Sequence, residues 1–303
     1  MKVSVVIPAY NEEKNIKPLY EKIKKVLSGD YEIIFVDDGS TDRTYQAIKS
    51  IKDSKVKVIK FRKNFGQTAA MDAGFKHSKG DVVIAMDADL QNDPEDIPRL
   101  LKKMEEGYDV ISGWRYNRKD SFLKTSISIF ANWLRKIITG ERIHDSGCSL
   151  KAYKKECLKD LNLYGEMHRF IPAILLWKGF KVGEVKVSHH PRKHGKTKYN
   201  LLRVLKGFLD LIVVAFWQKY SARPIHLFGS VGIGSGILGV IIGMYLTVRK
   251  ILYEESISNR PLLLLAILLI IIGVQFIVFG LLADILIKIY YKDHANYSIE
   301  RIE

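Results

Sequence analysis

Cysteine is scarce in this chain, since its 303 residues include only Cys148 and Cys157. The two form neither a Cys-x-x-Cys pair nor a Cys/His pattern with zinc-ligand spacing, so reduced cytosolic thiols are the simplest expectation. The sequence also contains no Walker P-loop and no Gly-x-Gly-x-x-Gly fingerprint. A P-loop NTPase and a dinucleotide dehydrogenase are therefore disfavoured.

We also expect no signal peptide. Met1 and Lys2 lead directly into Val3–Ile7, an apolar run too short for a signal sequence and followed by polar residues. We therefore expect the large N-terminal part of the chain to remain in the cytosol.

Acidic residues are in deficit, with 33 Asp and Glu against 48 Lys and Arg, which gives a formal net charge of +15. A basic balance suits nucleic acid, anionic lipid or phosphorylated ligands, or it reflects a lysine-rich surface. Two long apolar stretches near the C-terminus favour lipid and phosphate over nucleic acid, which we do not expect as a partner.

Those two stretches carry no charge at all over Ile225–Val248 and Leu262–Ala283. Each is longer than the roughly 20 residues that span a bilayer, although two buried helices of a soluble protein are the alternative. We predict a transmembrane hairpin over 223–291, with spans at about 225–248 and 262–286 and a cytosolic tail at 292–303. The protein would then be an integral protein of the cell membrane with its catalytic domain on the cytoplasmic face. Basic residues before the first span agree with the positive-inside tendency: Arg203, Lys206, Lys219 and Arg223.

Two features beside the spans suit a membrane. Leu201–Trp217 has a broad apolar face, which predicts an amphipathic interfacial helix over 200–222, with a core helix as the alternative. The first span contains the pairs Gly232/Gly236 and Gly239/Gly243, which permit close helix approach. That approach would occur within the hairpin or between subunits of a homo-oligomer.

The N-terminal part alternates between short apolar runs and helical patterns. Runs at Val3–Ile7, Glu32–Val36, Val56–Phe61 and Val82–Met86 are separated by helical patterns at Asn15–Leu27, Thr41–Ile51 and Gln67–His77. Alternation of this kind predicts an α/β domain with a mostly parallel sheet, which we place at 1–199. Ligands of such sheets bind at the carboxyl ends of the strands.

Polar residues follow three of these runs, in Pro8–Glu12, Asp37–Asp42 and Asp87–Gln91. Asp87 and Asp89 alternate with Ala88, so both side chains point to one side of an extended chain. Two carboxylates at the end of a buried strand are costly unless a cation meets them, and a hard divalent ion bound to a phosphate would do so. An ordinary strand-end turn is the alternative.

In this order and spacing, the segments Pro-Ala-Tyr-Asn-Glu from Pro8, Asp-Asp-Gly-Ser from Asp37, Asp-Ala-Asp-Leu-Gln from Asp87 and Gly-Trp-Arg from Gly113 resemble family 2 glycosyltransferases of the GT-A fold. Within that family the chain is most similar to the polyprenyl-phosphate hexose synthases. These include the dolichyl-phosphate mannose and undecaprenyl-phosphate glucose transferases. The resemblance covers about 1–220 and implies a Rossmann-like, mostly parallel catalytic domain.

The resemblance implies two groups of donor-site residues. Mg²⁺ or Mn²⁺ on the donor diphosphate would be held by Asp87, Asp89 and Gln91, oxygen ligands of the kind that hard cations take. The nucleotide would be bound by Pro8, Tyr10, Glu12, Asp37, Asp38 and Asp87. A packing role for Tyr10 and a helix-start role for Glu12 are the alternatives.

Basic residues form the predicted phosphate site. Arg115 follows a strand end, where a guanidinium can grip a phosphate bidentately, with a surface salt bridge as the alternative. The segment His189–Tyr199 is rich in histidine and basic residues. It is similar to the family's mobile loop, which closes over the pyrophosphate and the acceptor phosphate. A solvated basic loop and a three-histidine zinc site are the alternatives. The resemblance to the family implies catalytic roles for six residues: Asp89, Arg115, Lys124, Asp145, Arg192 and Lys196. It also implies contacts to the acceptor phosphate from Arg115, Lys124, Ser128, Arg192 and Lys198. The matches at Lys124, Ser128 and Asp145 are approximate.

A phosphate acceptor explains why cations would outnumber bases in this site. The second pKa of a phosphate monoester is about 6, so the acceptor is largely dianionic at neutral pH and needs no general base. We therefore predict inverting transfer of a hexose from a UDP- or GDP-linked donor to dolichyl or undecaprenyl phosphate. A glycolipid or polysaccharide hydroxyl acceptor is the alternative, although the sequence has no Gln-x-x-Arg-Trp motif of processive synthases. A non-enzymatic sugar-nucleotide sensor is a third reading.

Overall fold

The computed structural model describes residues 1–116, 140, 143–159, 161, 163, 165, 167–191, 213, 216, 219–220, 223–254, 256 and 261–291. The chain divides into two compact units, Met1–Val214 and Ala215–Glu303. This division lies inside the predicted interfacial segment 200–222. Several predicted site residues lie outside the described residues: Lys124, Ser128, Arg192, Lys196 and Lys198.

The first unit contains a seven-stranded sheet in the order β3-β2-β1-β4-β6-β5-β7. The strands are β1 (Val3–Ala9), β2 (Tyr31–Asp37), β3 (Val56–Lys60), β4 (Val82–Ala85), β5 (Val110–Arg115), β6 (Lys151–Lys154) and β7 (Val182–Val187). All pair in parallel except β6, which runs antiparallel to β4 and β5 on its two sides. The predicted mostly parallel α/β fold is confirmed.

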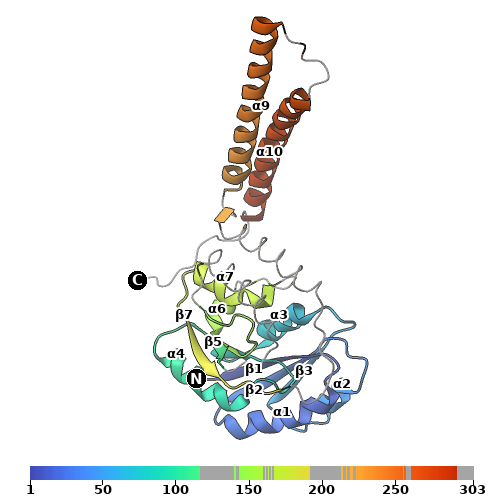
Figure 1. Ribbon diagram of the computed structural model, residues 1–303. Helices are drawn as coiled ribbons and strands as arrows, with labels where there is room; N and C mark the ends of the chain where they lie inside the picture. Colours follow the sequence, from blue (N-terminus) through green and yellow to red (C-terminus); the bar gives the residue numbers. More distant parts are fainter. Residues whose placement is uncertain are drawn as a thin grey trace. The chain divides into compact units, whose positions relative to one another are not determined.

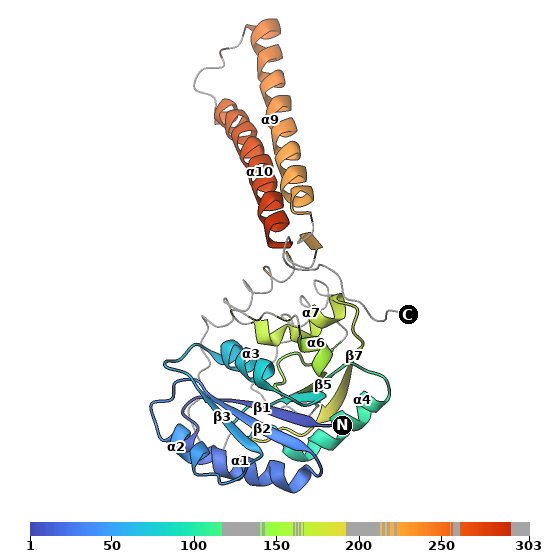
Figure 2. The same cartoon turned by 180° about the vertical axis from the view of Figure 1, so that it is seen from behind.

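Helices cover both faces of this sheet (Figures 1 and 2). One face is covered by α1 (Glu13–Val26), α2 (Thr44–Lys49) and α4 (Ile97–Glu105), which follows the 3-10 turn η1 (Pro94–Asp96). Their buried Ile16, Ile48 and Leu100 share a core with alternate residues of the strands. The opposite face carries α3 (Gln67–His77), α6 (Lys155–Leu158), the turn η2 (Met167–Arg169) and α7 (Ile171–Trp177).

The predicted helix Thr41–Ile51 is too long, because α2 begins only at Thr44. Asp42 Oδ1 accepts a hydrogen bond from the backbone N–H of Thr44 at 2.9 Å, so the residues before Thr44 form a turn and not the first turn of the helix. Neither Ser40 nor Thr41 caps the helix, since both are bound to Asn11.

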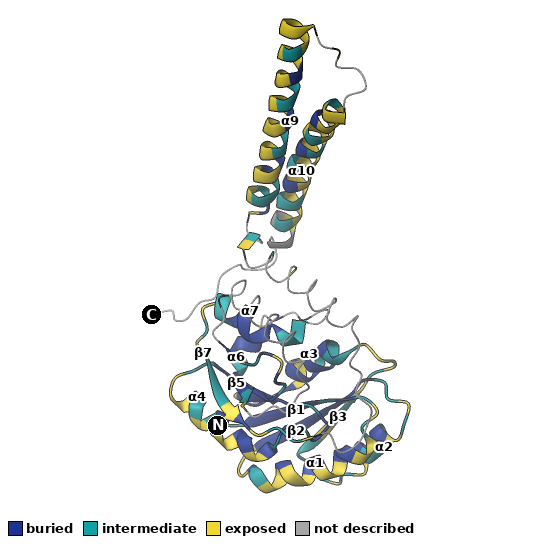
Figure 3. Cartoon of the chain, in the orientation of Figure 1, coloured by how far each residue is buried: buried dark blue, intermediate teal, exposed yellow. Residues whose placement is uncertain are grey.

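The second unit contains two long helices, α9 (Ile225–Tyr253) and α10 (Pro261–Tyr291). Both are long and apolar enough to cross a bilayer, and only 17% and 11% of their most apolar windows are buried. Most of their large apolar residues are exposed, as the burial colours of the two helices show (Figure 3). That exposure argues against the core helices of a soluble protein and agrees with the predicted spans.

Glycines bring α9 and α10 together. A Cβ on Gly232 would lie 2.6 Å from the carbonyl oxygen of Gly273, and one on Gly239 would lie 2.7 Å from that of Ala266. A Cβ on Gly236 or Gly243 would have no such neighbour within 4 Å. Gly232 and Gly239, one from each predicted pair, therefore point toward α10, and the backbone of Gly236 also lies within 3.1 Å of a Cβ on Gly273.

Candidate active site at the carboxyl edge of the sheet

The strand order gathers the predicted site residues at one edge of the sheet. Parallel strands place their carboxyl ends together, so Asp37 at the end of β2, Asp87 beyond β4 and Arg115 at the end of β5 share this edge. Because β6 runs the other way, the segment that leads into it reaches the same edge from outside the sheet. Asp145 lies in that segment.

The turn after β4 has an unusual backbone. Leu90 has a φ of 62°, a left-handed conformation that costs a residue with a Cβ roughly 1–2 kcal/mol. Its side chain is buried in the core beneath α1 and α4, which holds it there. The turn is closed by Asp89, whose Oδ1 accepts a hydrogen bond from Gln91 N at 3.1 Å. Backbone strain of this kind concentrates at functional sites.

Asp87 and Asp89 lie close enough to influence each other. Burial, and then the charge of Asp89, raise the pKa of Asp87 to about 6, against the opposing effects of Ser149, Lys151 and Arg115. Gln67, at the start of α3, donates from Nε2 to Asp87 Oδ1 at 2.6 Å. Two carboxylates that repel each other in a buried turn are a suitable ligand set for a divalent cation.

Gln91 completes the predicted ligand set. Its Nε2 donates to the carbonyl oxygen of His190 at 3.4 Å, an orientation in which the amide oxygen is the atom available to a metal. Across the described part of the chain, no group of three or more His, Cys, Asp or Glu side chains is arranged to hold a metal. A cation at this edge would thus rely on Asp87, Asp89 and the amide of Gln91.

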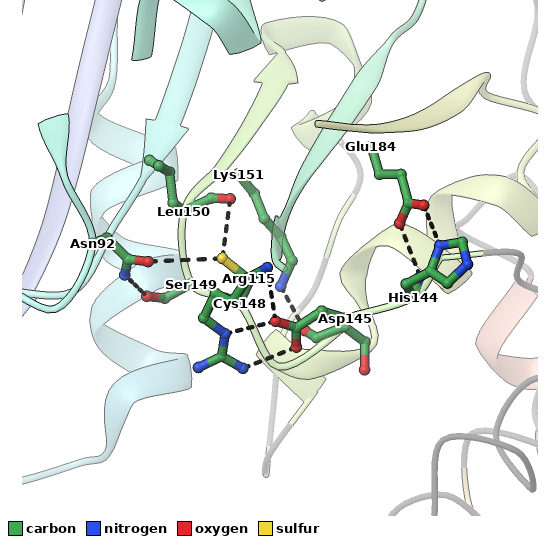
Figure 4. Close-up of polar contacts among 10 residues, drawn as sticks. Asn92, Arg115, His144, Asp145, Cys148, Ser149, Leu150, Lys151 and Glu184 are labelled. Atoms are coloured by element: carbon green, nitrogen blue, oxygen red, sulfur yellow. Dashed lines mark hydrogen bonds and ion pairs between the residues drawn. The ribbon is translucent and has the colours of Figure 1, made fainter. Parts of the chain in front are cut away.

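Arg115 and Asp145 form a bidentate ion pair (Figure 4). Arg115 Nε and Nη2 donate to the two carboxylate oxygens of Asp145 at 2.6 and 2.9 Å. Burial opposes the positive charge of Arg115, but the bonds and charge of Asp145 outweigh it and raise the pKa of the guanidinium. The side chains are only 13% and 14% exposed, so this is not a surface salt bridge.

The two neighbouring aspartates after β2 differ in their partners. Asp38 accepts backbone hydrogen bonds from Phe65 at 2.7 Å and Gly66 at 3.0 Å, which ties it to the start of α3. Asp37 is fully buried, and its Oδ1 accepts from Ser40 N at 3.0 Å. Its Oδ2 has no hydrogen-bond partner among the residues that the structure describes. Asp37 therefore offers a buried acceptor for a ligand, whereas Asp38 supports the loop.

The predicted nucleotide loops are joined to each other. Asn11, with a φ of 57°, accepts from Thr41 N at 2.8 Å and donates its own N–H to Ser40 Oγ at 3.0 Å. These bonds connect the Pro8–Glu12 segment to the Asp37–Asp42 segment. Glu12 accepts from the side chain of Asn15 at 2.5 Å, as the helix-start alternative expects. Pro8 and Tyr10 are half-buried on either side of Ala9.

The beginning of the basic segment lies against the Asp87–Gln91 turn. His190 N donates to Gln91 O at 2.8 Å, and His190 Nε2 lies 2.8 Å from Asp93 Oδ2. Asn92 donates to Ser149 Oγ at 2.7 Å, which ties the same turn to the segment that leads into β6. The described beginning of the basic segment, residues 189–191, therefore lies beside the predicted metal-binding turn Asp87–Gln91.

Sequence reasoning missed four polar residues of this edge: Gln67, Asn92, Ser149 and Lys151. Gln67 follows Gly66 at the start of a helix and carries no recognisable signal. Lys151 is different, because it precedes Ala152 and Tyr153 in an apolar strand and is only 3% exposed. A lysine in a short buried strand is a signal that the sequence does contain.

Comparisons with known sequences place the chain among related proteins. The sequence model of the family described as "Glycosyl transferase family 2" matches residues 4–161. The dodecaprenyl-phosphate galacturonate synthase of Rhizobium johnstonii is 41% identical over 100% of this chain and 93% of its own length. The undecaprenyl-phosphate 4-deoxy-4-formamido-L-arabinose transferase of Proteus mirabilis is 36% identical over 99% of this chain and 94% of its own.

A solved structure supports the fold. Glucosyl-3-phosphoglycerate synthase from Mycobacterium tuberculosis, crystallised with Mn²⁺, uridine diphosphate and glucosyl-3-phosphoglycerate, superposes with a TM-score of 0.57. The match covers 72% of this chain and 79% of that one at 20% identity. At this identity the similarity concerns the fold alone.

Proposed function

The chain belongs to glycosyl transferase family 2. We therefore propose that it transfers a sugar from a nucleotide-sugar to a polyprenyl phosphate at a membrane, and we propose a hexose as that sugar. The observation that carries the proposal is the meeting of Asp37, the Asp87–Asp89 pair and the Arg115–Asp145 pair at one sheet edge. The two full-length relatives are named for sugar transfer to dodecaprenyl and undecaprenyl phosphate.

On the donor side, Asp37 Oδ2 would accept a hydrogen bond from the base or ribose, supported by its burial and its lack of a described partner. Asp87, Asp89 and Gln91 would hold Mg²⁺ or Mn²⁺. When bound, that ion would neutralise charge on the departing nucleoside diphosphate. Mn²⁺ and uridine diphosphate in the solved M. tuberculosis synthase are consistent with such a donor site.

On the acceptor side, Arg115 would orient phosphate oxygens while Asp145 holds the guanidinium in place. Lys124, Ser128, Arg192, Lys196 and Lys198 complete the proposal from the sequence. An acceptor oxygen would form the bond to the anomeric carbon as the bond to the diphosphate breaks, with the electron pair leaving on the diphosphate and with inversion. A dianionic acceptor gives up no proton, so no general base is required.

The apolar helices α9 and α10 would anchor the protein beside its lipid acceptor. Lys219 and Arg223 precede the first helix, and positive charge at this position favours a cytosolic start. We therefore place the catalytic unit on the cytoplasmic face of the membrane.

The test is a panel of UDP- and GDP-sugars, uronic acid donors included, incubated with the full-length protein and short polyprenyl phosphates. We expect a polyprenyl-phosphate sugar in the lipid phase by mass spectrometry, lost on chelation and in Asp89→Ala. A water-soluble or polymeric product, or undiminished activity of Asp89→Ala in chelator, would overturn the proposal.

A further inference from the structure

Lys151 is a buried cation at the same edge of the sheet as the predicted donor site. It is the first residue of β6 and is only 3% exposed. In register it lies opposite Ala85 of β4 on one side and Ser112 of β5 on the other. β4 leads to Asp87 and Asp89, and β5 leads to Arg115, so Lys151 lies between the strands that carry the site's acids and its arginine.

The ammonium group is held in place by the backbone. Lys151 Nζ donates to the carbonyl oxygen of Ser146 at 2.9 Å, within the segment that also carries Asp145 (Figure 4). Burying an ammonium group is unfavourable unless nearby negative charge compensates it. A hydrophobic residue would pack this position without that cost, so the charge of Lys151 requires an explanation.

The surrounding charges supply one. Arg115 is matched by Asp145 in the bidentate pair, whereas Asp87 and Asp89 add two negative charges in one turn. Lys151 pairs in register with Ala85, two residues before Asp87, which places the lysine beside the strand end that leads into the two carboxylates. A fixed positive charge here also favours any dianion that enters the site.

We propose that Lys151 is a resident cation of the donor site, which favours binding of the nucleoside diphosphate and weakens the attraction of Asp87 and Asp89 for a free divalent ion. This inference rests on the proposed function. Lys151 is a positioning residue in this scheme, because its positive charge acts on bound ligands through the electrostatic potential at the carboxylates of Asp87 and Asp89.

The inference predicts changes of opposite sign in two affinities. In Lys151→Gln the side chain remains a hydrogen-bond donor, but the charge is gone. We expect free Mn²⁺ to bind this variant about three- to tenfold more tightly, as the loss of one nearby charge implies. The nucleoside diphosphate, measured in chelator, should bind more weakly by a similar factor.

The measurements use the full-length protein in detergent at pH 8, with Mn²⁺ binding followed by electron paramagnetic resonance and UDP and GDP binding by calorimetry. Lys151→Met gives a second uncharged variant, and Lys151→Arg keeps the charge and should retain both affinities. Lys154→Met is the matched control. It removes a lysine from the other end of the same strand, where Lys154 pairs with Asp109 at 2.7 Å.

Opposite changes in Lys151→Gln or Lys151→Met, with Lys151→Arg and Lys154→Met unchanged, would support the inference. A parallel loss of both affinities would indicate a packing role and overturn it, as would no change in either. Neither measurement uses a lipid acceptor. A wild-type protein that binds Mn²⁺ and nucleotide but transfers no sugar would refute the proposed function without deciding the role of Lys151.

Discussion

Arg115 and Asp145 face each other across 30 positions of sequence, with Nε–Oδ2 and Nη2–Oδ1 distances of 2.6 and 2.9 Å. Gly147 makes room for this pair, because a Cβ there would lie 3.2 Å from Arg115 Nη2. The guanidinium that the sequence assigns to a phosphate is thus oriented before any ligand arrives. A phosphate would therefore contact the edge of the guanidinium that does not bind Asp145, and not the Nε and Nη2 groups that donate to Asp145.

This pair makes Arg115→Lys a non-conservative change. A lysine keeps the charge but cannot match both oxygens of Asp145, so we expect kcat/KM for sugar transfer to fall by roughly tenfold to a hundredfold. Asp145→Asn should have a similar effect, since it leaves the arginine without its anionic partner. The matched control is Arg99→Lys, because Arg99 is exposed and pairs with Asp96 at 2.7 Å at the start of α4, away from the site. Wild-type kinetics in Arg115→Lys would contradict this role.

The contact between His190 and Asp93 predicts an effect on the acceptor. Its loss in His190→Ala should loosen the beginning of the basic segment, which keeps its backbone bonds to Gln91, so we expect KM for the polyprenyl phosphate to rise about five- to tenfold, as for a lost hydrogen bond to a charged group. Lys22→Ala is the control, since Lys22 touches the same Asp93 only through a 3.5 Å exposed contact. Equal KM values in the two variants would contradict the prediction.

Glu32 predicts a pH dependence of stability. Burial raises its pKa, but bonds from Lys57, Ser4 and the backbone of Lys79 outweigh burial, and the pKa in the folded state is lowered. The stabilisation is therefore complete above the unfolded value of about 4.3 and is lost as the pH falls through the lower folded value.

In Glu32→Gln we expect a lower thermal midpoint at pH 7 and a shallower decline of that midpoint below about pH 4.3. Thermal unfolding of the protein in detergent, followed across pH, measures both. Glu106→Gln is the control, because Glu106 is an exposed carboxylate paired with Lys103 on the surface. An acid decline in Glu32→Gln as steep as in the wild type would count against the prediction.

The glycines of the hairpin predict a difference between two matched substitutions. Gly273→Val would place a Cβ 2.6 Å from the carbonyl oxygen of Gly232, so the helices must separate and the thermal midpoint should fall. Gly234→Val adds the same side chain where no such atom lies within 4 Å and should leave the midpoint nearly unchanged. Equal midpoints for the two variants would show that α9 and α10 do not pack through Gly273.

Much of the fold could be predicted because it depends on local patterns. The apolar runs that became β1, β2 and β4 are short and β-branched, and α1 repeats its apolar residues at the helical period. Parallel strands then place their carboxyl ends together, so the grouping of Asp37 with Asp87 follows from the order of elements. The apolar spans follow from composition alone.

Other parts of the site depend on the register of strands far apart in the chain. The insertion of the antiparallel β6 between β4 and β5 brings Lys151 and Asp145 to this edge, and no local pattern encodes it. Asp37 and Asp38 are indistinguishable by type and adjacent in sequence. Only the fold leaves an oxygen of Asp37 unsatisfied among the described residues and ties Asp38 to the start of α3.

The sequence by itself determined which apolar runs form the first four strands, which stretches are long and apolar enough to cross a membrane, and which family the motifs resemble. These properties reside in short segments whose periodicity and composition act locally. Only the tertiary structure decided that Arg115 is held by Asp145, that Gln91 contacts His190 and that Lys151 is buried beside the carboxylates. The first two relationships join residues at least 30 positions apart in the sequence, and the third places a buried lysine near buried carboxylates. All three depend on how the strands pair.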